Sequence, residues 1–307
     1  MEVAPIRCAP SLNVRQKMNT LAIQALCQIE ASSAKSIWDA HQGCAALAGA
    51  LLVHQALVDS DANGLIETRI RTSLDSCRGH PGSGAAITRD SFAQRLLHEV
   101  GIHAQEPREI GHDVIYPAYV LRALDVFQID PWDSLLESLI SLVRKVKSSG
   151  PGWITVNGKN EIRPPSRAEE PSGSDYWALF SRFERPLSME MGDMQLGHLL
   201  THGHAIEILR GYGKASLLSD LDVAYRKRLH GLREANQEER NAVPLGRSPV
   251  DPRLKRYWES VTTLGDMHGH AIKYAYSFLD LKKNNISGAD LQAYGRIVWP
   301  DRPGPCI

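Results

Sequence analysis

The sequence predicts an all-α protein, a single large helical body with one small β-hairpin near residues 153–162. Apolar residues recur at helical spacing along most of the 307 residues. The strand pattern is confined to one short segment, and proline and glycine cluster in two longer stretches. We therefore expect one helical domain over 1–307, with a division into two subdomains near 150–175 as the alternative.

Helix start signals support several of the expected helices. Thr88 followed by Asp90 is typical of an N-cap and a first helical turn, and Ser287 is a second N-cap candidate. Pro131 stands near the first position of a helix over 132–148, where its missing N–H is tolerated. In chain order, the expected helices span 11–30, 34–58, 64–77, 89–103, 112–127, 132–148, 192–211, 216–237, 253–264, 267–282 and 288–297.

The hairpin is expected where residues 153–156 and 159–162 flank Asn157-Gly158. Asn-Gly favours the two-residue turn whose twist matches that of paired strands. Proline and glycine then predict loops over 163–175 and 242–252. We interpret the first loop as a lid over a site or as a linker.

The composition disfavours several functional classes. The formal net charge is zero, so we expect neither a nucleic-acid partner nor a membrane partner recruited by charge. No apolar run approaches the roughly 20 residues that span a bilayer, and residues 1–17 lack the apolar core of a signal peptide. The widely spaced cysteines, without a Cys-x-x-Cys pair, predict free thiols and a cytoplasmic location: Cys8, Cys27, Cys44, Cys77 and Cys306.

Lys273 is the most unusual residue of the chain, because it lies in the otherwise apolar segment 271–279. A buried ammonium is costly unless it is paired or neutralised. A neutral amine can add carbon dioxide and become a carbamate, which is an anionic oxygen ligand for a metal. The alternatives are a lysine that extends to water, or one that pairs with Asp266 or Asp280.

Histidines recur around this lysine and elsewhere in the chain. His270 lies one helical turn before Lys273, and the residues His-Gly-His-Ala-Ile occur at both 202–206 and 268–272. The flanks of the two copies differ, so chance explains the repeat equally well. A true repeat would make His204 the counterpart of His270.

Four further histidines are candidate metal ligands, although each taken alone is as readily a packed or surface histidine. His198 and His202 are four residues apart on an expected helix, so their side chains share a face. His112 is expected in a first helical turn, where the helix dipole favours the neutral imidazole that binds metal. His41 has small neighbours that permit close approach. Cys44 is nearby, but a buried apolar role fits it better than a ligand role.

These residues together resemble the questin oxidase-like family of oxygenases, over about residues 41–279. The segment from His112 to Leu124 is similar to the family's H-G-V-I-R-x-A-H-A-V-R-A-L motif, with Asp113 in place of the glycine. His198-Leu199-Leu200-Thr201 is similar to H-x-V-T, and His270-Ala271-Ile272-Lys273 matches H-A/V-I-K. Ala40-His41 stands where the family usually has Asn-His.

The resemblance implies a mostly helical oxygenase that acts with molecular oxygen on a polycyclic aromatic or phenolic natural product. The implied reactions are Baeyer–Villiger-type oxidation and oxidative ring opening. The implied centre is a mononuclear non-haem Fe(II) held by four histidines and a carboxylated lysine: His41, His112, His198, His270 and Lys273. His202 is the alternative to His198, and we assign His202 and Tyr119 as candidate catalytic residues.

Several points stay open at this stage. Imidazole and carbamate donors suit iron, but histidine-rich sites also bind zinc and manganese. The sequence does not define the exact substrate, the need for an external reductant or the oligomeric state. Four aromatic residues are candidates to line a planar substrate pocket, although ordinary core packing explains each equally well: Tyr116, Tyr119, Trp177 and Tyr274.

Two other functions compete with the oxygenase. A metal-dependent phosphohydrolase of the HD type would use His112-Asp113, with His54 or His98 before it and Asp125 after it. This hypothesis leaves His270 and Lys273 without a role. A non-catalytic helical binding protein is the third hypothesis, and the absence of a solenoid repeat counts against a repeat scaffold.

Overall fold

A computed structural model describes residues 10–35, 37, 39–74, 84–106, 108–146, 175–181, 195–238, 251–263, 269–283, 285–295 and 297. The described part of the chain is all-α, with twelve α-helices, two short 3-10 helices and a single isolated bridge in place of strands. The expected hairpin at 153–162 and nearly all of both expected loops fall outside the described residues. None of the described helices is long and apolar enough to cross a membrane.

Every expected helix has a counterpart, with boundaries that differ by a few residues. The largest shift is in the helix expected from residue 34, which begins at Ala40 because the described residues ahead of it form turns. One α-helix, α7, was not expected. The α-helices are α1 (Leu12–Ser32), α2 (Ala40–His54), α3 (Asn63–Leu74), α4 (Arg89–Ile102), α5 (His112–Val126), α6 (Asp133–Lys145), α7 (Tyr176–Ser181), α8 (Gly197–Leu209), α9 (Ala215–Glu238), α10 (Lys255–Thr263), α11 (His270–Lys282) and α12 (Gly288–Tyr294). The 3-10 helices are η1 (Ser60–Ala62) and η2 (Glu109–Gly111).

Two expected caps are confirmed, and one start signal is wrong. The Thr88 side chain accepts a hydrogen bond from the Ser91 amide, and Ser287 forms a capping box with Asp290. Pro131, however, precedes α6, whose N-cap is Trp132. The reason is tertiary: the Pro131 carbonyl accepts from the Ile87 amide at 3.1 Å, which holds this segment extended beside the residues ahead of α4.

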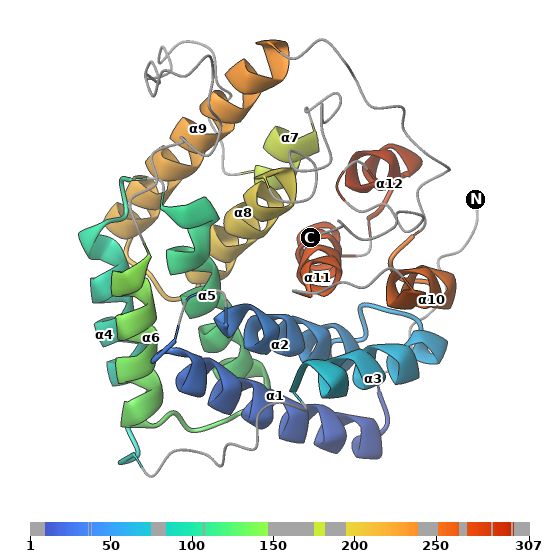
Figure 1. The fold of residues 1–307 in the computed structure, drawn as a ribbon, viewed down its shortest axis with the longest axis horizontal. Helices are drawn as coiled ribbons and strands as arrows, with labels where there is room; N and C mark the ends of the chain where they lie inside the picture. Colours follow the sequence, from blue (N-terminus) through green and yellow to red (C-terminus); the bar gives the residue numbers. More distant parts are fainter. Residues whose placement is uncertain are drawn as a thin grey trace.

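Helix α2 is the central helix of the fold and packs against α1, α3, α5 and α11 (Figure 1). All but two of its residues are buried. Glycine lets neighbouring helices approach it closely: a Cβ atom on Gly43 would lie 2.7 Å from Ile29 of α1, and one on Gly49 would lie 2.8 Å from Ile70 of α3. The small residues of the sequence therefore determine how tightly α2 is enclosed.

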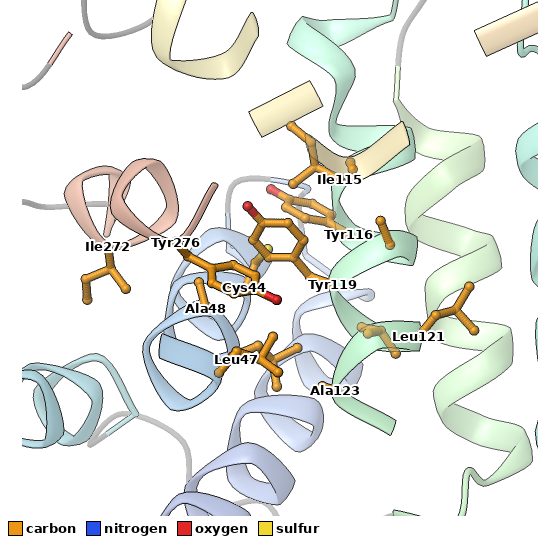
Figure 2. Packing of buried hydrophobic residues seen from close by; sticks show 14 of the residues in the cluster. Cys44, Leu47, Ala48, Ile115, Tyr116, Tyr119, Leu121, Ala123, Ile272 and Tyr276 are labelled. Carbon is orange, nitrogen blue, oxygen red and sulfur yellow. The ribbon is translucent and has the colours of Figure 1, made fainter. Parts of the chain in front are cut away.

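Four helices form a closed ring of contacts: α2 packs on α5, α5 on α8, α8 on α11 and α11 on α2. Figure 2 shows part of the core within this ring, to which α5 contributes Tyr116 and Tyr119 and α2 contributes Cys44 and Leu47. Tyr276 of α11 lies on the same core. The candidate ligands belong to these four helices, so the ring positions the site.

Candidate metal centre

A histidine stands in the first turn of each of the four ring helices. His112 and His270 are the first residues of α5 and α11, and His41 and His198 are the second residues of α2 and α8. The helix starts converge: the centroids of neighbouring imidazole rings are 4.5–5.7 Å apart. Residues far apart in the sequence are thereby gathered at one buried point.

Three of these histidines form the tightest group. His41, His112 and His198 are fully buried, and each offers a nitrogen within 4.8 Å of the others. The Nε2 atoms of His41 and His112 are only 2.7 Å apart. Two nitrogens bound to one ion at about 2.1 Å lie at most about 4.2 Å apart. The three side chains therefore fit a common metal ion after small adjustments.

Lys273 and His270 adjoin this group. The Lys273 side chain is 1% exposed, and its Nζ lies 2.5 Å from His41 Nδ1. It does not extend to water, and Asp280, one expected partner, instead bonds His204. The other expected partner, Asp266, lies outside the described residues. The His270 ring lies 4.8 Å from that of His198 and 5.2 Å from that of His41.

The electrostatics of the site favour neutral imidazoles. Burial lowers the pKa of His41 well below its usual value, and the charges of Lys273 and His112 lower it further. Burial also lowers the pKa of His198 well below its usual value, and the charge of His270 lowers it further. The positive ends of the helix dipoles act in the same direction. Neutral imidazole is the form that ligates metal.

Two glycines direct the chain into the ring helices. Gly111 (φ 87°) precedes His112 and Gly269 (φ 67°) precedes His270, both in the left-handed conformation that favours glycine. A Cβ atom on Gly269 would lie 2.2 Å from the Ala45 Cβ. Gly203, the matching glycine in the other His-Gly-His-Ala-Ile copy, lies inside α8, so the two copies differ in structure.

Two tyrosines hold the histidines in place. The Tyr274 hydroxyl lies 3.2 Å from His198 Nδ1 and orients that ring. The Tyr116 hydroxyl donates to the Ile37 carbonyl at 2.8 Å, and its ring stacks on His112. Of the four aromatic residues expected around a substrate, these two adjoin the histidines. Trp177 instead donates to Asp290 of α12.

His202 and His204 do not join the group, although both are buried on α8 with His198. The His202 ring packs against Gly111 and lies 5.6 Å from the Tyr225 ring. The expected clamp of His198 and His202 is therefore not formed. The rival pairing of His204 with the ligand set is not formed either, because His204 Nε2 lies 2.9 Å from Asp280.

Tyr119 belongs to a second polar network next to the centre. Its hydroxyl lies 2.7 Å from Ser277 Oγ, and His204 Nδ1 lies 3.2 Å from the same oxygen. His204 continues the network to Asp280, whose side chain is partly exposed. Burial raises the pKa of Tyr119, so its phenol stays protonated. Tyr119 thus contacts this network rather than the three histidines.

Other candidate residues do not join the three-histidine group. Burial raises the pKa of Cys44 to about 12, which keeps it a thiol and not a thiolate ligand. The residues of the HD hypothesis are dispersed: His98 and Asp125 are exposed, and His54 packs on Phe127. Asp125 bonds the Tyr212 hydroxyl. The structure does not gather them around His112.

Arg228 of α9 is a buried residue that the sequence reasoning missed. It is 4% exposed and donates from Nη2 to the Gln195 carbonyl at 3.0 Å. Its neighbours Arg226 and Lys227 make the segment resemble a solvated basic run. The available signal was its spacing, because Arg228 falls on the apolar stripe of Leu221, Tyr225 and Leu232.

Comparison of the chain with protein families, with curated proteins and with solved structures finds no match.

Proposed function

We propose that the protein is a metal-dependent oxygenase, with a mononuclear non-haem iron held by His41, His112 and His198. The observation that carries this proposal is the convergence of three buried imidazoles from three helices. The burial of all three side chains and the lowered pKa values of His41 and His198 suit a ligand set better than a set of surface histidines. The substrate class, a polycyclic aromatic or phenolic compound, rests on the resemblance of the histidine motifs to questin oxidase-like oxygenases.

His270 and Lys273 complete the proposed ligand set. Ferrous iron, when bound, supplies the one-electron chemistry that molecular oxygen needs to react with an organic substrate. The protein contributes a dry site, because all five side chains are at most 6% exposed. Tyr274 and Tyr116 hold His198 and His112 in position.

Lys273 is proposed to act as its carbamate. The neutral Nζ forms a bond to the carbon of carbon dioxide, and one N–H proton is released. The product is an anionic oxygen donor, which places a negative charge beside the metal where a neutral amine stood before. Burial of Nζ against His41 Nδ1 supports this role.

The proposal is tested by metal content and oxygen uptake. Protein loaded anaerobically with ferrous iron is expected to hold about one iron per chain, a stoichiometry set by one ligand group. His112→Ala and Lys273→Ala should lose iron while keeping their helical circular dichroism, because alanine favours helix. Carbon-13 bicarbonate should give a carbamate signal in the wild type that Lys273→Ala lacks.

Two surface variants serve as controls. His98→Ala and Lys255→Ala alter exposed residues and should bind iron like the wild type. Oxygen uptake with hydroxylated polycyclic phenols should require iron and not zinc or manganese. Absence of iron from the loaded wild type, or equal iron in His112→Ala, would overturn the proposed centre.

A further inference from the structure

Arg228 is a cation enclosed in the protein next to the candidate metal centre. Burial lowers its pKa to about 9, while Tyr225, Tyr274 and Asp113 act in the opposite direction, so the guanidinium stays charged near neutral pH. Nη2 bonds the Gln195 carbonyl, three residues before His198. Nη1 is buried and has no hydrogen-bond partner among the described residues. An unpaired donor on a buried cation is costly unless a ligand satisfies it.

His202 presents a second unsatisfied donor in the same region. It is 2% exposed, and neither ring nitrogen has a hydrogen-bond partner in the described part of the chain. The charge of Arg228 contributes to lowering the pKa of His202 to about 3, after the larger effect of burial. The ring is therefore neutral and carries one N–H donor.

Both residues are neighbours of His198, one of the candidate ligands. Arg228 is anchored on the turn that leads into α8, and His202 lies one helical turn beyond His198. The charge of Arg228 acts on the His198 imidazole. Two aromatic residues, Tyr225 and Tyr274, also lie beside this guanidinium.

The described carboxylate that acts on Arg228 is shared with a second arginine. Asp113 acts on Arg228, but its Oδ2 also lies 3.9 Å from Nη1 of Arg108, another buried arginine. One carboxylate thus faces two guanidinium groups. Among the described residues this leaves a surplus of positive charge beside the centre, which favours an anionic ligand.

We propose that Arg228 and His202 form a subsite that binds an ionised hydroxyl oxygen, a phenolate or enolate, of the substrate. This inference rests on the proposed function for the aromatic character of the substrate. Each residue has one donor nitrogen to offer: Nη1 of Arg228, since Nη2 is already engaged, and one ring nitrogen of His202. Two single donors suit one oxygen atom, whereas a carboxylate favours the paired donors of a free guanidinium.

The test uses 2-hydroxyanthraquinone and its methyl ether, 2-methoxyanthraquinone, as probes with metal-free protein. The visible absorption of the first dye reports directly whether it is bound as the phenol or as the phenolate. Wild-type protein should bind the phenolate form and thereby lower the pKa of the hydroxyl group of the dye. Arg228→Gln should weaken phenolate binding about tenfold or more, the effect of one hydrogen bond to a charged group.

Matched variants separate recognition from folding. Arg226→Gln removes an arginine of the same helix whose guanidinium pairs with Asp222, and it should bind the dye like the wild type. His202→Phe keeps a ring at the site and should weaken phenolate binding severalfold, which tests the subsite even where Arg228→Gln fails to fold. The methyl ether should bind all variants equally.

The outcomes distinguish this subsite from the metal proposal. Equal phenolate binding by wild type and by the Arg228→Gln and His202→Phe variants would overturn the subsite, as would absence of phenolate binding to the wild type. Iron content is measured separately on the same proteins. Arg228-dependent dye binding in a protein that takes up no iron would support the subsite and overturn the metal centre.

Discussion

At the scale of single residues, burial fixes protonation states that an exposed side chain would not hold. His202 is the clearest case, because its pKa falls to about 3 while an unfolded chain has the ordinary value near 6.5. Below pH 6.5 the His202 imidazole is protonated in the unfolded chain but stays neutral in the folded protein. The contribution of His202 to stability is therefore lost as the pH falls from 6.5 towards 3.

Substitution of His202 is expected to reduce the acid sensitivity of the fold. A pH of 5 lies about 1.5 units below the pKa of His202 in the unfolded chain. At roughly 1.36 kcal/mol per pKa unit, keeping His202 neutral in the folded protein lowers the free energy of unfolding at pH 5 by about 2 kcal/mol. The difference in unfolding free energy between pH 7 and pH 5 should thus be about 2 kcal/mol smaller in His202→Phe. Urea unfolding at both pH values measures it. The exposed His98→Ala is the control, and an unchanged pH dependence in His202→Phe would contradict a buried neutral imidazole.

At the scale of elements, the site depends on where four helices begin. A helix start exposes unpaired N–H groups and the positive end of the helix dipole, so a histidine in the first turn is favoured in its neutral form. Because the four helix starts converge, these neutral imidazoles meet at one centre. Gly111 and Gly269 allow the chain to turn sharply just before His112 and His270. The glycines of these two turns are therefore needed to build the centre, as well as the histidines.

Gly269→Ala is expected to disturb both the fold and the centre. Left-handed backbone costs an alanine about 1–2 kcal/mol, and its Cβ would lie 2.2 Å from the Ala45 Cβ. The free energy of unfolding should fall by about 2 kcal/mol or more, with weaker iron binding, as measured by urea unfolding and metal titration. Gly64→Ala meets nothing within 4 Å on α3 and should be neutral or stabilising. Equal stability of the two variants would argue against a constrained turn.

At the scale of the whole molecule, the proposed ligands connect segments from both ends of the chain. α2 lies near the N-terminal end of the described residues and α11 near the C-terminal end, yet they pack together. A metal ion bound by α2, α5, α8 and α11 would link these helices only in the folded state. Binding to the folded state alone raises stability by mass action.

Metal removal is therefore expected to lower the melting temperature. Ligand at 1,000 times its dissociation constant adds about 4.1 kcal/mol, which corresponds to a shift on the order of 5–10 °C for a protein of this size. Calorimetry of iron-loaded protein with and without chelator measures this. His41→Ala should show no such difference, and a wild type insensitive to the chelator would contradict a metal linking these helices.

The sequence by itself determined the helical fold class, because apolar periodicity and local caps such as Thr88 and Ser287 act within one helix. It also singled out the histidines of the four ring helices. Only the tertiary structure decided among His198, His202 and His204, because all three are buried on α8 and the helices around it decide which face meets the centre. Arg228 was hidden for the same reason: whether a basic side chain is solvated or enclosed depends on what packs against its helix.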